Sequence, residues 1–142
     1  MTIPIEQEDD LLTCRMLASD FAHKAGFPED DLIRIATAVS EIVRNVIMYA
    51  NSKGSLMLQF DGVELTVIVA DSGPGIKDVS RAMQDGYSTS GGLGIGIAGA
   101  KRLMGEMDIS SVPGRGTTIT LRKVLHALRG TTRVSPSYVV RT

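Results

Sequence analysis

The residues best suited to bind an anion are a run of glycines at residues 91–96, Gly-Gly-Leu-Gly-Ile-Gly, which leads into a predicted helix. Glycine backbone can approach a ligand closely, and the first N–H groups of a helix carry partial positive charge, so this pattern favours phosphate. The chain has no G-x-x-x-x-G-K-[ST] motif, which excludes a P-loop. Residues 94–99 match G-x-G-x-x-G, but no strand precedes them, so a dinucleotide fold is disfavoured and a ligand-free glycine loop stays the alternative.

A second candidate is the carboxylate of Asp71, which ends a β-rich run and opens the loop Asp71-Ser-Gly73-Pro-Gly75. A rigid Gly-Pro-Gly turn could hold this carboxylate at the floor of a pocket. There it could accept a hydrogen bond from an exocyclic amine such as that of adenine. An ordinary β-turn is the alternative, because Asp, Gly and Pro are common turn residues.

A third candidate is the pair Glu41 and Asn45, which are four residues apart on a predicted helix. This spacing puts both side chains on one helix face, in a stripe away from the apolar face. An amide oxygen and a carboxylate so placed could hold Mg²⁺ and orient an attacking hydroxyl. The alternative is a pair of solvated polar residues on an amphipathic helix.

The elements that must position these residues follow from apolar periodicity, helix caps and turn residues. Helices and hairpins segregate along the chain, which predicts an α+β fold with a mostly antiparallel sheet. The expected elements are an edge strand at 2–8, helices at 9–25 and 28–50, a hairpin of 56–60 and 63–70, helices at 78–84 and 95–104, and strands at 107–112 and 117–124.

Composition narrows the function classes. The 142 residues carry a formal charge of −1, with aromatics at 4% and no Trp, which argues against a nucleic-acid partner. The lone Cys14 excludes an intrachain disulfide, and His23 and His126 are too few for a zinc site. The sequence lacks an apolar run of membrane-spanning length and a signal-peptide pattern, so we expect a cytoplasmic protein without a membrane partner.

Taken together, the three signals resemble the motif set of the GHKL ATPases. They occur in the order Glu41-x-x-x-Asn45, Asp71-x-Gly-x-Gly75, Gly92-x-Gly94-x-Gly96 and Gly116-Thr117-Thr118. Within that superfamily the chain is similar to the small bacterial serine-protein kinases and anti-sigma factors, and most of all to the RsbT-type stressosome switch kinases. The resemblance covers roughly residues 5–123.

The resemblance implies a single-domain two-layer sandwich, the Bergerat fold, with a mixed, mostly antiparallel sheet covered by helices on one face. Residues 1–124 would form the ATP-binding kinase domain, and 125–142 a basic tail. Asp71 would bind the adenine amine, with Thr117 nearby, and Asn45 would coordinate Mg²⁺. Glu41 would be the catalytic base. The remaining nucleotide-binding positions implied are Gly73, Gly75, Gly92, Leu93, Gly94 and Gly96.

The function implied is an ATP-dependent protein serine/threonine kinase. It would phosphorylate a STAS-domain antagonist and activate a PP2C-type phosphatase or another output enzyme by binding. The alternatives are an anti-sigma factor that sequesters a sigma factor, and a nucleotide-dependent interaction protein without kinase activity. Ser90 departs from related anti-sigma kinases, which often carry Arg before the lid glycines. The γ-phosphate would lack that cation unless Lys101, Arg102 or another basic side chain supplies it, and otherwise turnover would be slow or would need the partner to complete the site.

Overall fold

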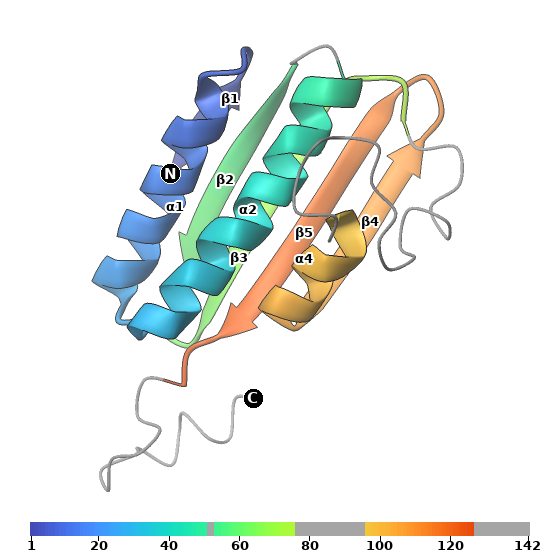
Figure 1. The fold of residues 1–142 in the computed structure, drawn as a ribbon. Coiled ribbons are helices and arrows are strands. Elements are labelled where there is room, and N and C mark those ends of the chain that lie inside the picture. The colour runs from blue at the N-terminus through green and yellow to red at the C-terminus, as the bar shows by residue number, and fades with distance from the viewer. Residues whose placement is uncertain (51–52, 76–95, 127–142) are drawn as a thin grey trace, which may run out of the picture.

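The computed structural model describes residues 1–50, 53–75 and 96–126 (Figure 1). The predicted helix at 78–84, nearly all of the glycine-rich segment and the tail from residue 127 lie outside the described residues. The described elements are β1 (Thr2–Ile5), α1 (Asp10–Ala25), α2 (Glu29–Tyr49), β2 (Gly54–Phe60), β3 (Glu64–Asp71), α4 (Gly96–Met104), β4 (Glu106–Val112) and β5 (Gly116–Val124). This order confirms the predicted α+β arrangement.

The strands form one five-stranded sheet in the order β1-β2-β3-β5-β4. All of the described pairings are antiparallel, so the sheet is more uniform than the mixed sheet expected. β1 lies at one edge as predicted, but it is shorter than the predicted 2–8 and ends at Ile5. The pairing of β3 with β5 joins segments far apart in the chain, and it sets Asp71 opposite Thr117.

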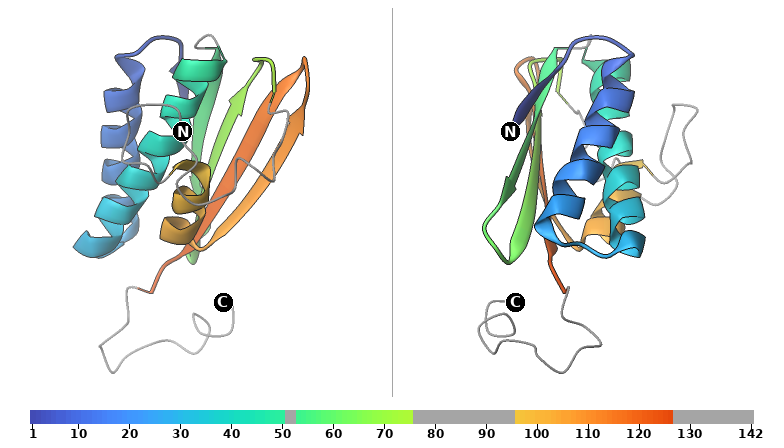
Figure 2. Two further views of the ribbon diagram at one scale, coloured as in Figure 1. Left: turned by 45° about the vertical axis from the view of Figure 1, so that its right-hand side comes forward. Right: turned by 90° about the vertical axis from the view of Figure 1, so that its left-hand side faces the viewer.

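The described helices α1, α2 and α4 lie on one face of the sheet (Figure 1 and Figure 2). Local signals set their ends. α1 ends at Gly26, whose φ of 107° is left-handed and whose N–H donates to the carbonyls of Ala22 and His23. α2 starts after Pro28, and three acidic residues follow in its first turn, where the helix dipole favours them.

α2 is the central helix, because it packs against α1 on one side, α4 on the other and the sheet below. Six consecutive residues, 38–43, are buried, which a helix covered on one side alone could not achieve. The core between the layers is aliphatic, with Ile35, Val39, Leu56, Val67 and Leu121 at its centre. No helix in the described ranges is both long and apolar enough to cross a bilayer.

Candidate active site

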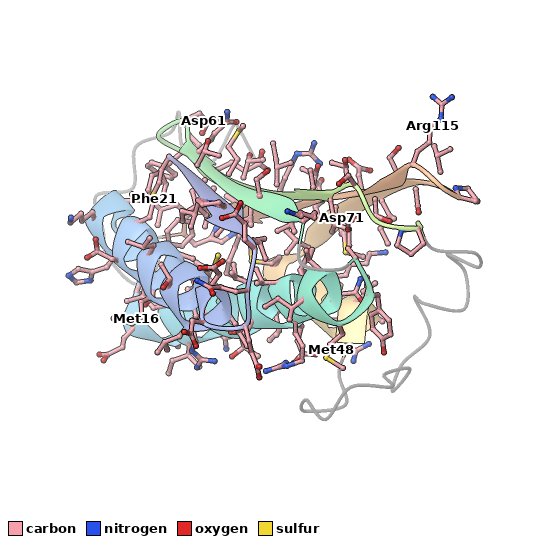
Figure 3. All side chains as sticks on the ribbon, turned by 90° about the horizontal axis from the view of Figure 1, so that it is seen from above. Met16, Phe21, Met48, Asp61, Asp71 and Arg115 are labelled. Carbon is pink, nitrogen blue, oxygen red and sulfur yellow. The ribbon has the colours of Figure 1, made fainter. Side chains whose placement is uncertain are left out.

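The carboxylate of Asp71 sits where β3, β5 and the end of α2 meet, and Figure 3 shows it between the sheet and that helix. Its Oδ1 accepts hydrogen bonds from the backbone N–H of Gly73 at 2.9 Å and of Thr117 at 3.3 Å. The Thr117 hydroxyl, in turn, lies 2.9 Å from that of Ser111 on β4. These bonds fix the carboxylate through one oxygen. Oδ2 makes no hydrogen bond to any described residue, so it can accept one from a ligand.

The loop after Asp71 is held from both sides. A Cβ on Gly73 would lie 2.5 Å from the Cβ of Ala50, at the end of α2, so only glycine fits there. On the other side the N–H of Gly114, in the β4–β5 turn, donates to the carbonyl of Pro74 at 2.8 Å. Gly75 has a φ of 81°, and a Cβ on it would lie 2.7 Å from the Val112 carbonyl oxygen. The end of α2 and the β4–β5 turn therefore hold the loop in place between them.

Glu41 is buried, with 6% of its surface exposed. The alternative reading of this residue as a solvated polar side chain is therefore wrong. Its Oε2 accepts a hydrogen bond from Nη1 of Arg44 at 2.9 Å, and the Arg44 side chain is 28% exposed. Burying a carboxylate is costly without such a charge-assisted partner, so the pair explains how Glu41 is tolerated inside the fold.

Asn45 lies one helical turn beyond Glu41 and is half-buried. Its side-chain amide makes no hydrogen bond to a described residue. The carbonyl oxygen of this amide is a hard oxygen donor of the kind that Mg²⁺ takes, and a carboxylate lies on the same face. The donor set thus fits a magnesium ion that keeps most of its own waters.

Gly96 is the first residue of α4 and has a φ of 56°, a conformation that favours glycine. The helix it starts packs against α2. The other three predicted phosphate-binding residues, Gly92, Leu93 and Gly94, lie outside the described residues, as does Ser90. Lys101 and Arg102, considered above as substitute cations, are both exposed on α4.

Comparison with known proteins decides the family. The family described as histidine kinase-like ATPase domain matches residues 4–123, which is most of the chain. The chain belongs to this family. Membership implies that it uses ATP, and the motif residues Glu41, Asn45, Asp71 and Thr117 all fall inside the matched range.

Two bacterial proteins are similar to most of the chain. The chain is 42% identical over 132 residues to the serine/threonine-protein kinase RsbT of Bacillus subtilis (strain 168), covering 87% of this chain and 95% of that protein. It is 31% identical over 118 residues to an anti-sigma F factor of Thermoanaerobacter sp. (strain X514), covering 78% of this chain and 82% of the relative.

A solved structure of the RsbU and RsbW domains of a Mycobacterium tuberculosis protein has the same fold. The TM-score is 0.66 at 20% sequence identity, over 88% of this chain and 32% of that one. The two proteins therefore share a fold although their sequences are only distantly similar.

Sequence reasoning missed one contributor to this ATPase site. Arg44 is the cation that accompanies Glu41, and its spacing of three residues along a helix was the available signal. Gly116 was part of the fourth motif without a role of its own: its φ is 124°, and a Cβ there would collide with the backbone carbonyl of Asp71. This glycine brings β5 close to β3 at the point where Thr117 meets Asp71.

Proposed function

We propose that this chain is the protein kinase of a bacterial partner-switching pathway of the stressosome type. It transfers the γ-phosphate of ATP to a serine or threonine of a STAS-domain antagonist. It then activates a PP2C-type phosphatase or another output enzyme by binding to it. The serine/threonine kinase activity is the part that the relatives support directly, because 42% identity extends over 95% of a serine/threonine-protein kinase. We place the protein in the cytoplasm.

The observation that carries the proposal is a buried carboxylate, Glu41, one helical turn from the Asn45 amide, whose oxygen no described residue bonds. Both stand on the helix whose end touches the Asp71 loop through Ala50 and Gly73. The residues proposed as general base, metal ligand and adenine acceptor therefore lie on α2 and on the loop that contacts its end. A nucleotide-dependent binding module would need the metal ligand and the adenine acceptor but not the general base.

Each residue then has a role that its surroundings suit. Oδ2 of Asp71 accepts from the adenine amine, and Gly73 and Gly75 let the base lie against the loop. Asn45 holds the Mg²⁺, which neutralises charge on the phosphates when bound. Gly92, Leu93, Gly94 and Gly96 contact the phosphates through backbone N–H groups. Glu41, held by Arg44, takes the proton from the accepting hydroxyl as the oxygen bonds to phosphorus and ADP leaves.

Intact-mass spectrometry of a STAS protein encoded beside this chain, after incubation with Mg-ATP, tests the proposal. We expect one added phosphate with the wild type and a rate roughly 10²–10⁴ lower with Glu41→Gln, since that is the usual contribution of a general base. Glu106→Gln, an exposed carboxylate on β4, is the matched control and should keep wild-type transfer. Transfer that survives in Glu41→Gln, with ATP bound, would contradict the role of Glu41.

Sequestration of a sigma factor is the second candidate function. The identity of 31% to an anti-sigma F factor over 82% of its length supports it. If the wild type binds ATP but adds no phosphate to the STAS protein, co-purification with a sigma factor becomes the deciding measurement. ATP-dependent retention of the sigma factor would then replace the kinase proposal.

A further inference from the structure

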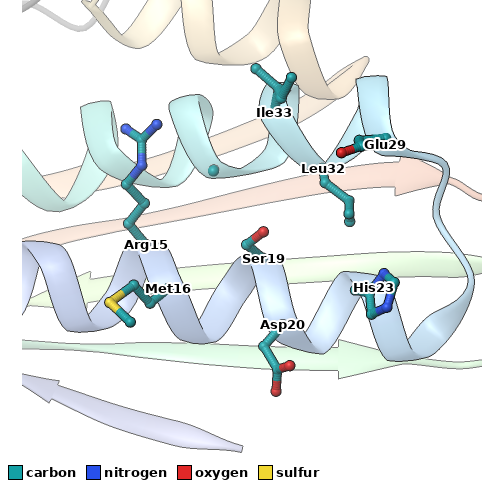
Figure 4. Close-up of a pocket in the computed structure, with 9 residues that line it drawn as sticks. Arg15, Met16, Ser19, Asp20, His23, Glu29, Leu32 and Ile33 are labelled. Atoms are coloured by element: carbon teal, nitrogen blue, oxygen red, sulfur yellow. The ribbon is translucent and has the colours of Figure 1, made fainter.

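A groove of about 550 Å³ lies between α1 and α2, on the outer side of the helix layer (Figure 4). Met16 of α1 and Leu32 and Ile33 of α2 form its apolar lining. Met16 is 61% exposed and Ile33 is 63% exposed, which is unusual for large apolar side chains on neighbouring helices. Exposed apolar side chains that line a concave surface indicate a site where another segment binds.

One end of this groove is acidic. His23 and Glu29 line it there, where α1 turns into α2, and Asp20 lies about one turn earlier on α1. Asp20 forms an exposed ion pair with Lys24 at 3.1 Å, which neutralises little of its charge in water. Glu29 makes no ion pair with a described residue, and it opens an acidic first turn of α2. Arg15 marks the other end, with its guanidinium bonded to the Ser40 hydroxyl at 3.2 Å.

The described part of the chain ends beside this acidic end. The N–H of Leu125 donates to the carbonyl of Val63 at 2.7 Å, and its side chain lies within 3.8 Å of the Cβ position of Gly26. Gly26 is the residue at which α1 stops. The segment 127–142 therefore starts where α1 and α2 join, at the acidic mouth of the groove.

The composition of residues 127–142 complements the groove. The segment contains Arg129, Arg133 and Arg141 and has no Asp or Glu. Ala127 and Leu128 precede Arg129, and further apolar residues follow Arg133, at Val134 and in the run 138–140, Tyr-Val-Val. Arg129 and Arg133 therefore come before the apolar run 138–140, in the order of the acidic mouth and the apolar lining.

We propose that the segment 127–142 of this same chain occupies the groove between α1 and α2. Arg129 and Arg133 pair with Glu29 and Asp20, and the apolar residues beyond them cover Met16 and Ile33. Length is no obstacle, because the groove runs for about 12 Å along α1 and sixteen extended residues can span about 50 Å. A short tether also raises the local concentration of the segment to the order of mM, so a weak contact suffices.

Occupation of the groove by the tail has a regulatory consequence that is separate from the proposed kinase chemistry. The same surface is closed to other proteins while the tail lies in it. Release of the tail, through salt or through a competitor of higher affinity, opens it. The device would work equally in a kinase and in a sigma-binding protein.

The test uses the full chain with ¹³C-labelled methionine methyl groups, whose NMR signals report on Met16 directly. Met16→Leu assigns the signal, and Met57, half-buried on β2 of the sheet, serves as the distant reference. Reversing the tail charges with Arg129→Glu and Arg133→Glu should move the Met16 signal and leave the Met57 signal in place. Raising the salt to about 0.5 M in the wild type should move the Met16 signal in the same direction, because the attraction is screened.

Charge exchange distinguishes a specific contact from a general effect. Glu29→Lys alone should move the Met16 signal as the tail variant does, whereas Glu8→Lys, an exposed residue before α1, should not. Combining Glu29→Lys with Arg129→Glu and Arg133→Glu should return the Met16 signal most of the way to its wild-type position. The proposal is overturned if the tail substitutions leave the Met16 signal unchanged. It is also overturned if Glu8→Lys moves the Met16 signal as far as Glu29→Lys does. Unchanged circular dichroism of each variant shows that the fold is intact.

Discussion

The guanidinium of Arg44 donates to the carboxylate of Glu41 at 2.9 Å, less than one helical turn further along α2. Only 4% of the Glu41 side chain is exposed, against 28% for Arg44, so the arginine links a buried carboxylate to the surface. This contact sets where the Glu41 oxygens lie. It also makes Arg44 a positioning residue for any reaction in which Glu41 takes a proton.

We predict that Arg44→Met lowers kcat for phosphate transfer by at least tenfold while KM for ATP stays within about twofold, because the base is displaced and the nucleotide contacts remain. Stability should fall by about 1–3 kcal/mol, since Glu41 loses its partner inside the fold. Arg34→Met is the control. Arg34 pairs with the buried Asp31 at 3.0 Å, but nothing places it near Glu41, so its loss should leave kcat unchanged. Equal kcat values in Arg44→Met and Arg34→Met would show that Arg44 does not position Glu41.

Asp71→Asn should change which purine is bound. The substituted amide keeps an oxygen for the N–H groups of Gly73 and Thr117, so the loop stays in place. The free Oδ2 becomes an NH₂ group, which repels the adenine amine and can donate to the 6-oxo group of inosine. We expect ATP affinity to fall by at least tenfold and the preference for ATP over ITP to shrink or reverse, since each lost or mispaired hydrogen bond costs about 1–3 kcal/mol. Titration with both nucleotides measures this.

An Asp71→Asn variant that keeps the wild-type ratio of ATP to ITP affinity would show that Oδ2 does not contact the base. Asp71→Ala provides the comparison. It also removes the two hydrogen bonds to the loop, so it should lose thermal stability, which Asp71→Asn should not.

Gly73→Ala tests the contact between the loop and α2. The added Cβ would lie 2.5 Å from the Cβ of Ala50, so either the loop or the end of α2 must move. Overpacking of this kind costs about 1–3 kcal/mol, and the displaced loop should bind ATP more weakly. The second substitution Ala50→Gly should restore part of the loss, because it removes one of the two clashing atoms.

Gly62→Ala is the matched glycine control. It meets open space but has a φ of 97°, so it carries backbone strain without any contact near the site. Thermal unfolding should therefore show a loss of stability with unchanged ATP affinity. An equal loss of ATP affinity in Gly62→Ala would mean that the effect of Gly73→Ala is not local.

The buried thiol of Cys14 makes the free energy of unfolding depend on pH in the alkaline range. Burial, with a smaller contribution from the charge of Asp10, raises the pKa of its thiol from 9.0 to about 11. The unfolded state loses the thiol proton at a lower pH than the folded state does. The stabilisation is thus fully present below pH 9 and is lost as the pH rises towards 11.

Urea unfolding of the wild type and of Cys14→Ala isolates this effect from other groups that titrate in the same range. The wild type should lose about 2 kcal/mol more than the variant between pH 8 and pH 10.5, which follows from the raised pKa. At pH 8 the native thiol should also resist a thiol reagent until the protein unfolds. Parallel pH dependences in the two proteins would contradict this prediction.

Local sequence signals determined most of the elements. Asp61 and Gly62 predicted the hairpin, and the Asp61 side chain accepts from the N–H groups of both Val63 and Glu64. Gly26 and Pro28 set the junction between the two long helices as expected. β1 is the exception. It ends at Ile5, which pairs with Gly54 at the start of β2, so the extent of β2 and not the sequence of β1 sets this end.

The motifs located the candidate site along the chain, but only tertiary structure decided which residues meet there. The apolar periodicity of the helix predicted that Glu41 lies on a polar stripe, because such a pattern describes one helix without its neighbours. Packing of α2 between α1, α4 and the sheet buried it and left Arg44 as its partner. Likewise the β3–β5 pairing, across 46 residues of sequence, brought Thr117 to Asp71. Residue types and spacing are local properties and could be read directly. Burial and strand order depend on every neighbouring element at once, and so the folded chain alone determined them.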